Sequence, residues 1–172
     1  TEYRGGAADD LDAGVRLEVT GFHDAASGTI LAQEIRFVQA QVRFEAPVAV
    51  ADVMAGESIT IIGSSVVFTP QTRDQDGIAA AGLAETTQVQ VRGLIDSAGL
   101  MSATRVRDRG NPDPTDIRLR GPISSASAPN LLLLGVTVDT RSALFVDANN
   151  APITAAAFFA QVLPGSIIET ET

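Results

Sequence analysis

The chain repeats itself, and this repeat limits the possible fold more than any other feature of the sequence. The segment Leu17–Gly21 (LEVTG) matches Val89–Gly93 (VQVRG). Each is followed by a Gly-containing turn and then by a second segment, Ser27–Arg36 or Ala98–Arg107, which has a central Ala and ends with an apolar residue and Arg. Apolar and polar residues alternate in these segments, which predicts strands with one buried face.

A second pair of matching segments extends the repeat. Val42–Val48 (VRFEAPV) matches Ile117–Ile123 (IRLRGPI), and Ile59–Val66 matches Leu131–Val138. Both members of the last pair begin with a continuous apolar run, which favours strands covered on both faces. Self-similarity at a period of roughly 70 residues predicts tandem small domains rather than a solenoid.

The phase of the repeat predicts one complete unit and two partial ones. We expect residues 1–40 to be a partial repeat made of closing strands, residues 41–110 a complete β-barrel repeat, and residues 111–172 a repeat that lacks its closing strand. The segment Pro164–Thr172 aligns with Ala13–Gly21 and stops where the closing strand of the unit is expected to begin. The two partial repeats are therefore expected to complement each other. A first residue Thr1 with no Met predicts a processed or excised product.

Composition indicates an aliphatic core with little helix. Hydrophobic residues make up 45% of the chain, but aromatic residues only 5%. Val, Ile, Leu and Ala must therefore fill the core. Two Ala-rich segments, Ile78–Ala84 and Ala155–Gln161, are each expected to form a turn or two of helix between strands.

The charge balance argues against a nucleic-acid partner. The chain has 21 acidic residues and 12 basic ones, all of them Arg, for a net charge of −9. Nucleic-acid affinity depends largely on cationic neutralisation of phosphates, so we expect no such partner. No apolar run approaches the roughly 18–20 residues needed to cross a bilayer, so we expect no membrane insertion. The absence of cysteine excludes disulfides and thiolate sites.

The repeated segments resemble a bacterial family catalogued as domain of unknown function 5666. The resemblance rests on Val91–Gly93, Gly99–Val106 (GLMSATRV) and Leu133–Asp139 (LLGVTVD). It implies tandem small OB-like β-barrels of about five strands per repeat, in a protein exported from the cell. It carries over no catalytic residue.

No arrangement of residues in the sequence predicts catalysis. His23 is the only histidine, the Gly-x-Ser-x-Gly elbow is missing, and without Lys there is no phosphate-binding P-loop. We therefore expect no enzyme and no required cofactor. Acidic residues in two loops are compatible either with solvated loops or with weak Ca²⁺ binding, since carboxylates are the ligands that Ca²⁺ prefers. They are Asp74, Asp76, Asp108, Asp113 and Asp116.

The complementary partial repeats suggest a structural role. An unpaired sheet edge invites a strand from another chain, and a head-to-tail contact of this kind produces a filament. We expect residues 117–172 to be the acceptor and residues 1–37 the donor in an extracellular or cell-surface fibre of identical copies. The assembly residues would be Val15, Leu17, Val19, Ile30, Ile35, Ile167, Ile168 and Thr170.

Two alternatives remain open at this stage. The chain could be a fragment of a longer cell-surface adhesion or spacer protein built from the same repeats. It could also be a monomeric exported binding module, in which the N-terminal strands close the last unit of their own chain.

Overall fold

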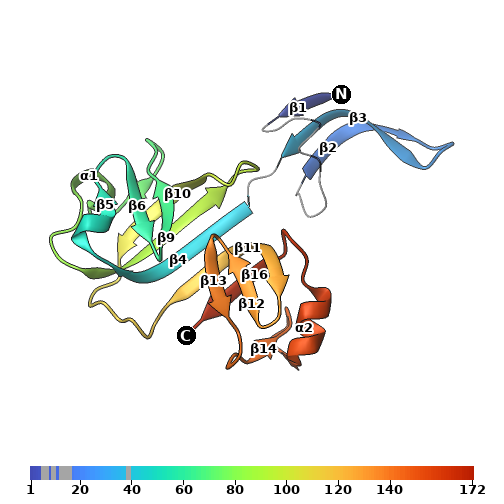
Figure 1. Cartoon of the computed structure of the whole chain (residues 1–172). Helices are drawn as coiled ribbons and strands as arrows, with labels where there is room; N and C mark the ends of the chain where they lie inside the picture. The colour runs from blue at the N-terminus through green and yellow to red at the C-terminus, as the bar shows by residue number, and fades with distance from the viewer. Residues whose placement is uncertain (5–7, 9–10, 12–16, 38–39) are drawn as a thin grey trace.

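The chain folds into β-sheets with very little helix, which confirms the predicted all-β class (Figure 1). The computed structural model describes residues 1–4, 8, 11, 17–37 and 40–172. Two α-helices occur in this part, α1 (Ile78–Ala81) and α2 (Ala155–Gln161), and a 3₁₀ turn covers Val50–Asp52. The strands form a three-stranded sheet, an eleven-stranded sheet and a two-stranded hairpin.

The first unit is a curled sheet formed by residues 40–108. Its strands are β4 (Ala40–Val48), β5 (Val53–Met54), β6 (Ser58–Ile61), β7 (Ser64–Val67), β8 (Arg73–Asp74), β9 (Thr87–Ile95) and β10 (Met101–Asp108). They are ordered β5-β6-β7-β10-β9-β4, and β8 also pairs with β10. Both β7 and β8 run parallel to β10, whereas the other pairs are antiparallel. Because β4 also contacts β6, the sheet curls around a core.

The core of this unit is aliphatic apart from one aromatic ring. Phe44 lies on β4, and Ile59, Val66, Val91 and Val106 face it from the other strands; all five are fully buried. Each such side chain contributes about 1.5–3 kcal/mol relative to an exposed position. The alternation seen in the sequence arises because successive residues of a strand point to opposite faces of the sheet.

The second unit, residues 117–172, follows the same plan up to a point. Its strands are β11 (Arg118–Ser127), β12 (Asn130–Leu133), β13 (Val136–Asp139), β14 (Phe145–Val146), β15 (Pro152–Ile153) and β16 (Ile167–Glu171). β11 pairs with β12 and with β16, and β12 pairs with β13. Helix α2 precedes β16, and the Thr154 hydroxyl caps it by accepting a hydrogen bond from the Ala157 amide.

The two units share their strand register. Ile59 lies opposite Val66 in the β6–β7 hairpin, and the matching Leu131 lies opposite Val138 in β12–β13. Both hairpins turn through two residues with positive φ, Ile62–Gly63 in one and Leu134–Gly135 in the other. Two such residues are the mark of the type I′ turn that suits tight hairpins. The sequence repeat is thus also a repeat of backbone geometry.

The sheet near the N-terminus repeats the β9–β10 pair. It consists of β1 (Glu2–Arg4), β2 (Leu17–Asp24) and β3 (Thr29–Phe37), in the order β1-β3-β2. Val19 lies opposite Ile35, as Val91 lies opposite Val106. A register shift occurs at the same place in both hairpins. It lies between Thr20 and Gly21 of β2 in one hairpin, and between Ala103 and Arg105 of β10 in the other. β1 runs parallel to β3 as β8 does to β10.

Equivalent strands of the two units join them into one sheet. β4 and β11 pair antiparallel, with Phe44 opposite Leu119, Arg43 opposite Arg120 and Glu45 opposite Arg118. Phe44 and Leu119 occupy the same position in the repeat. The units therefore face each other across a local two-fold axis, an arrangement that the sequence analysis did not foresee.

Gly93 lies where the β9–β10 pair leaves no room for a side chain. A Cβ at this residue would lie 2.4 Å from the Ser102 carbonyl oxygen on β10. We expect Gly93→Ala to lower the free energy of unfolding by roughly 1–3 kcal/mol, because the strands must separate to admit the methyl group. Urea unfolding followed by circular dichroism measures this change. Thr104→Ala, at an exposed residue of the same bulge, should cost less than about 0.5 kcal/mol. An equal loss in both variants would contradict the argument.

Candidate assembly site

The second unit has an open strand position that is filled in the first. In the first unit β10 lies between β9 and β7 and hydrogen-bonds to both. In the second unit the equivalent neighbours are β16 and β13. Within the described part of the chain, β16 pairs only with β11, and β13 pairs only with β12. The place between them holds no described strand.

Side chains next to this open position are less buried than their counterparts. Val66 and Val89 of the first unit are fully buried. The matching Val138 and Ile168 of the second unit are only half-buried. Burial of apolar surface stabilises a fold by about 25 cal/mol per Å², and surface that stays in water does not contribute. The second unit therefore becomes more stable if another strand covers this edge.

The β2–β3 hairpin presents the complementary feature, an apolar face without a core. The exposed fraction of Val19 is 43%, against 0% for its counterpart Val91. Ile30 is 59% exposed, against 8% for Met101. Leu17, Ala32 and Ile35 share this face and are half-buried. The residues that fill the core of one copy of the hairpin are thus exposed or only half-buried in the other.

The structure distributes the predicted assembly residues over these two features. Leu17, Val19, Ile30 and Ile35 lie on the hairpin face, whereas Val15 lies outside the described residues. The other three are on β16: Ile167 lies opposite Pro122, Ile168 opposite Gly121 and Thr170 opposite Leu119. No described strand of the hairpin pairs with the second unit, so the two features are separate within one chain.

Strand β16 is held to its neighbours by five residue pairs and by surface ion pairs. Glu169 lies 3.5 Å from Arg43 on β4 and 4.0 Å from Arg120 on β11. Glu171 lies 3.4 Å from Arg118. Exposed ion pairs of this kind contribute little to stability and weaken in salt. β16 thus forms fewer residue pairs than β2, which forms eight with β3.

A buried carboxylate lies beside this strand, at the junction of the two units. The side chain of Glu45 is 5% exposed and lies 2.7 Å from the Arg43 guanidinium and 3.4 Å from that of Arg109. It also accepts a 2.6 Å hydrogen bond from the Gln90 amide. Burial raises the pKa of Glu45, but the hydrogen bonds from Arg43 and Gln90 and the two guanidinium charges together hold it below 4.5.

We expect Glu45→Gln to destabilise the protein at neutral pH but not in acid. A carboxyl with a lowered pKa stabilises the fold above its unfolded pKa, and this contribution is lost as pH falls through the folded value. At pH 7 the variant should lose roughly 1–3 kcal/mol, because two guanidinium groups lose their anion. The difference from the wild type should shrink towards pH 3. Urea unfolding at both pH values measures it.

The matched control is Glu57→Gln, at an exposed carboxylate. Its free energy of unfolding should stay within about 0.5 kcal/mol of the wild type. A loss at Glu45 that is the same at pH 7 and pH 3 would contradict the electrostatic explanation.

The carboxylates considered as Ca²⁺ ligands form hydrogen bonds or ion pairs with other groups of the chain. Asp74 accepts a hydrogen bond from the Ala80 amide, Asp76 from the Asp108 amide, and Asp113 from Thr115. Asp108 binds the Thr87 hydroxyl and Asp116 pairs with Arg118. Within the described residues, no group of three or more His, Cys, Asp or Glu side chains is placed to hold a metal ion.

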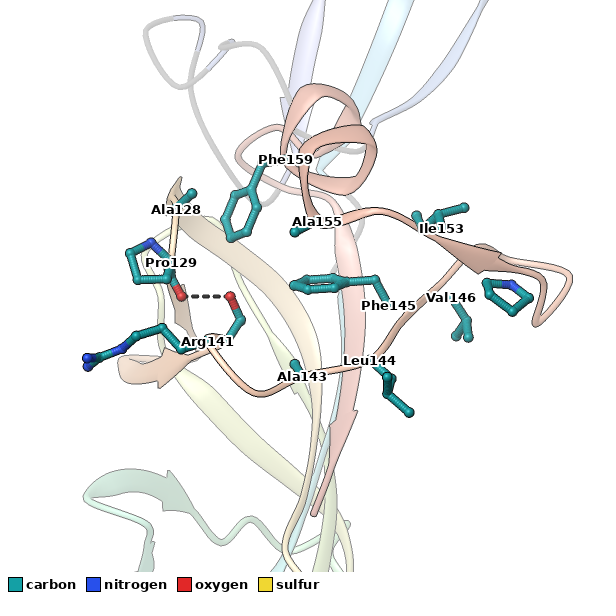
Figure 2. Close-up of a pocket in the computed structure, with 12 residues that line it drawn as sticks. Ala128, Pro129, Arg141, Ala143, Leu144, Phe145, Val146, Ile153, Ala155 and Phe159 are labelled. Atoms are coloured by element: carbon teal, nitrogen blue, oxygen red, sulfur yellow. Dashed lines mark hydrogen bonds between the residues drawn. The ribbon is translucent and has the colours of Figure 1, made fainter.

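The second unit also contains an apolar pocket of about 490 Å³ that the sequence analysis missed (Figure 2). It lies between the β14–β15 hairpin, helix α2 and the start of β12. The Phe145 ring is 4.8 Å from Phe158 and 6.1 Å from Phe159 between ring centroids. The Thr140 hydroxyl donates a 2.7 Å hydrogen bond to the Pro129 carbonyl at its edge. The pair Phe158–Phe159 within an Ala-rich segment was the only sequence sign of this cluster.

These features define an all-β repeat protein with an unfilled strand position. The chain belongs to the family described as Domain of unknown function (DUF5666), whose model matches residues 1–36 and 49–107. The predicted family membership is thus confirmed. No curated protein and no solved structure matches the chain. No helix in the described residues is long and apolar enough to cross a membrane.

Proposed function

We propose that this protein is a non-enzymatic structural subunit whose copies join head to tail by β-strand complementation. The β2–β3 hairpin of one copy completes the second unit of the next. One observation carries this proposal. The second unit lacks a strand at the position that β10 fills in the first, and the hairpin is a copy of the β9–β10 pair with its core-forming face in solvent.

The strand order supports an OB-like barrel as the architecture of each completed unit. If β5 and β6 count as one curved strand, the first unit has the order 1-2-3-5-4-1, with α1 between the third and fourth strands. A five-stranded, partly open Greek-key barrel is the OB type. In the second unit the order is 3-2-1-4, so the position of the fifth strand is open.

The hairpin enters the second unit intact. β3 lies along the free edge of β13, and β2 takes the place of β16 beside β11. This exchange breaks the five β11–β16 residue pairs and the hydrogen bonds that Gly165, Ser166 and Thr172 form beside them. The separation of β3 from β2 would break eight residue pairs. The exchange also places Val19 opposite Leu119, where Thr170 now lies. The new pair is apolar, as is its counterpart, Phe44 with Val91 in the first unit.

Such a contact joins two different surfaces and therefore does not end at a dimer. Contacts between different surfaces generate rings or open filaments, whereas a two-fold contact ends at a dimer. The β4–β11 pair keeps both units of each subunit in one continuous sheet. We also propose placement outside the cell, as the resemblance to exported proteins implies.

Engineered cysteines test the proposed register directly, since the chain has none of its own. Ser102 lies opposite Val67 in the first unit, and the same register places Leu31 of one copy opposite Asp139 of another. We expect Leu31→Cys and Asp139→Cys chains to form a disulfide-linked heterodimer when they are mixed and oxidised. Asn149→Cys, in an exposed turn, replaces Asp139→Cys in the control mixture. Equal cross-linking in both mixtures would overturn the register.

Electron microscopy and light scattering test the assembly itself. The wild type should form filaments whose mass grows with concentration. Val19→Asp should abolish them, because the charge would enter a core. Thr20→Asp, on the opposite face of the same strand, should leave them intact. A monodisperse 17.9 kDa wild type would overturn the filament.

A binding module is the second candidate, and the apolar pocket beside Phe145 favours it. Its volume falls within the range of small-molecule sites. A monomer in which residue 31 cross-links to residue 139 of the same chain, in the doubly substituted protein, would support this reading. In a longer polypeptide, the hairpin could instead bind another repeat of the same chain. That result would support the spacer alternative.

A further inference from the structure

Four arginines gather on the outer surface of the first unit. Arg105 on β10 lies directly opposite Arg92 on β9 and beside Arg73 on β8. Arg107 is two residues further along β10, on the same face. Neighbouring strands are about 4.8 Å apart, so these side chains leave the sheet side by side. Their alternate neighbours Val91 and Val106 point into the core.

None of these four guanidinium groups has a carboxylate partner among the described residues. The other described arginines all form ion pairs with carboxylates within 4.0 Å: Arg4, Arg36, Arg43, Arg109, Arg118, Arg120 and Arg141. The chain carries 21 acidic residues. The four arginines that lack a carboxylate partner nevertheless share a single face of three adjacent strands. We call Arg73, Arg92, Arg105 and Arg107 the arginine cluster.

The arginine cluster has hydrogen-bonding capacity to spare. The Nε atoms of Arg105 and Arg107 are buried and have no hydrogen-bond partner. Arg105 Nη2 donates only to the Gln75 side chain, at 2.6 Å. Burial lowers the pKa of Arg107, and the charges of Arg109, Arg105 and Arg92 lower it further. Like charges directly opposite each other in a sheet destabilise it.

The fold does not require this cluster, as the internal repeat shows. In the β1-β3-β2 sheet, Glu34 lies beside Glu2 and opposite Thr20, where the first unit has Arg105, Arg73 and Arg92. There the acids pair with Arg4 and Arg36. The same backbone thus accommodates ion-paired residues at the positions where the first unit accumulates positive charge.

We propose that the arginine cluster binds a phosphate- or sulfate-type oxyanion. Guanidinium groups present planar pairs of N–H donors that match the oxygens of such anions, and charge-assisted hydrogen bonds are the strong ones. The anion would neutralise the repulsion between Arg92 and Arg105. It would also accept hydrogen bonds from the terminal guanidinium N–H groups of the cluster. This site is separate from the open strand position, so it does not depend on the assembly proposal.

Isothermal titration with inorganic phosphate and pyrophosphate tests the site, in chloride buffers of matched ionic strength. The wild type should bind saturably, and Arg92→Gln/Arg105→Gln should bind at least about tenfold more weakly, since the loss of 1.4 kcal/mol corresponds to that factor. Arg36→Gln/Arg141→Gln removes the same charge from ion-paired surface positions and should bind like the wild type. Circular dichroism checks that each variant is folded. Equal binding in both variants, or none in the wild type, would overturn the proposal.

Vesicles of phosphatidylcholine with and without phosphatidylserine identify the source of the oxyanion. Co-sedimentation with the phosphatidylserine vesicles alone, lost in Arg92→Gln/Arg105→Gln, would assign the site to a lipid headgroup. Saturable phosphate binding without co-sedimentation would assign it to a soluble anion. Vesicle binding that is equally strong in the variant would contradict a role for the cluster.

Discussion

The organisation of this chain depends on one requirement, that the edges of a β-strand find hydrogen-bond partners. In the first unit every long strand meets this requirement: β10 joins β7 to β9, and the sheet curls until β4 contacts β6. In the second unit β13 and β16 each have one described partner. The proposal that a strand from another copy fills the gap follows from this difference. Apolar burial adds to it, because Val138 and Ile168 lie beside the same gap.

The junction between the units meets the same requirement in another way. β4 and β11 pair across a local two-fold axis, with Phe44 opposite Leu119. A contact of this symmetry satisfies both strands and then ends, so it cannot by itself extend an array. It does impose an electrostatic constraint, because Arg43 and Arg120 become direct neighbours. The exposed Glu169 pairs with both of them, and the buried Glu45 also pairs with Arg43.

Local patterns in the sequence predicted local structure well. The strands of both repeats follow the alternation, and α2 covers the predicted Ala155–Gln161. Helix α1 is shorter than the predicted Ile78–Ala84, because Gly82 has a φ of 81° and ends it. The β4–β11 pair could not be predicted, since identical periodicity is compatible with many strand partners. The arginine cluster was missed for the same reason: Arg73, Arg92 and Arg105 become neighbours only once the register of three strands is known.

The arginine cluster also shows how far a net charge can mislead about a surface. A net charge of −9 argues against a large polyanion, because such a partner meets the field of the whole molecule. A small oxyanion instead meets the field within about one Debye length, roughly 8 Å at physiological salt. Directly beside Arg105, the adjacent strands place two further arginines, Arg73 and Arg92. The internal repeat carries Glu at two of the equivalent positions, so the same sheet geometry supports either sign. Binding chemistry can therefore differ between repeats while the core residues that define the fold stay the same.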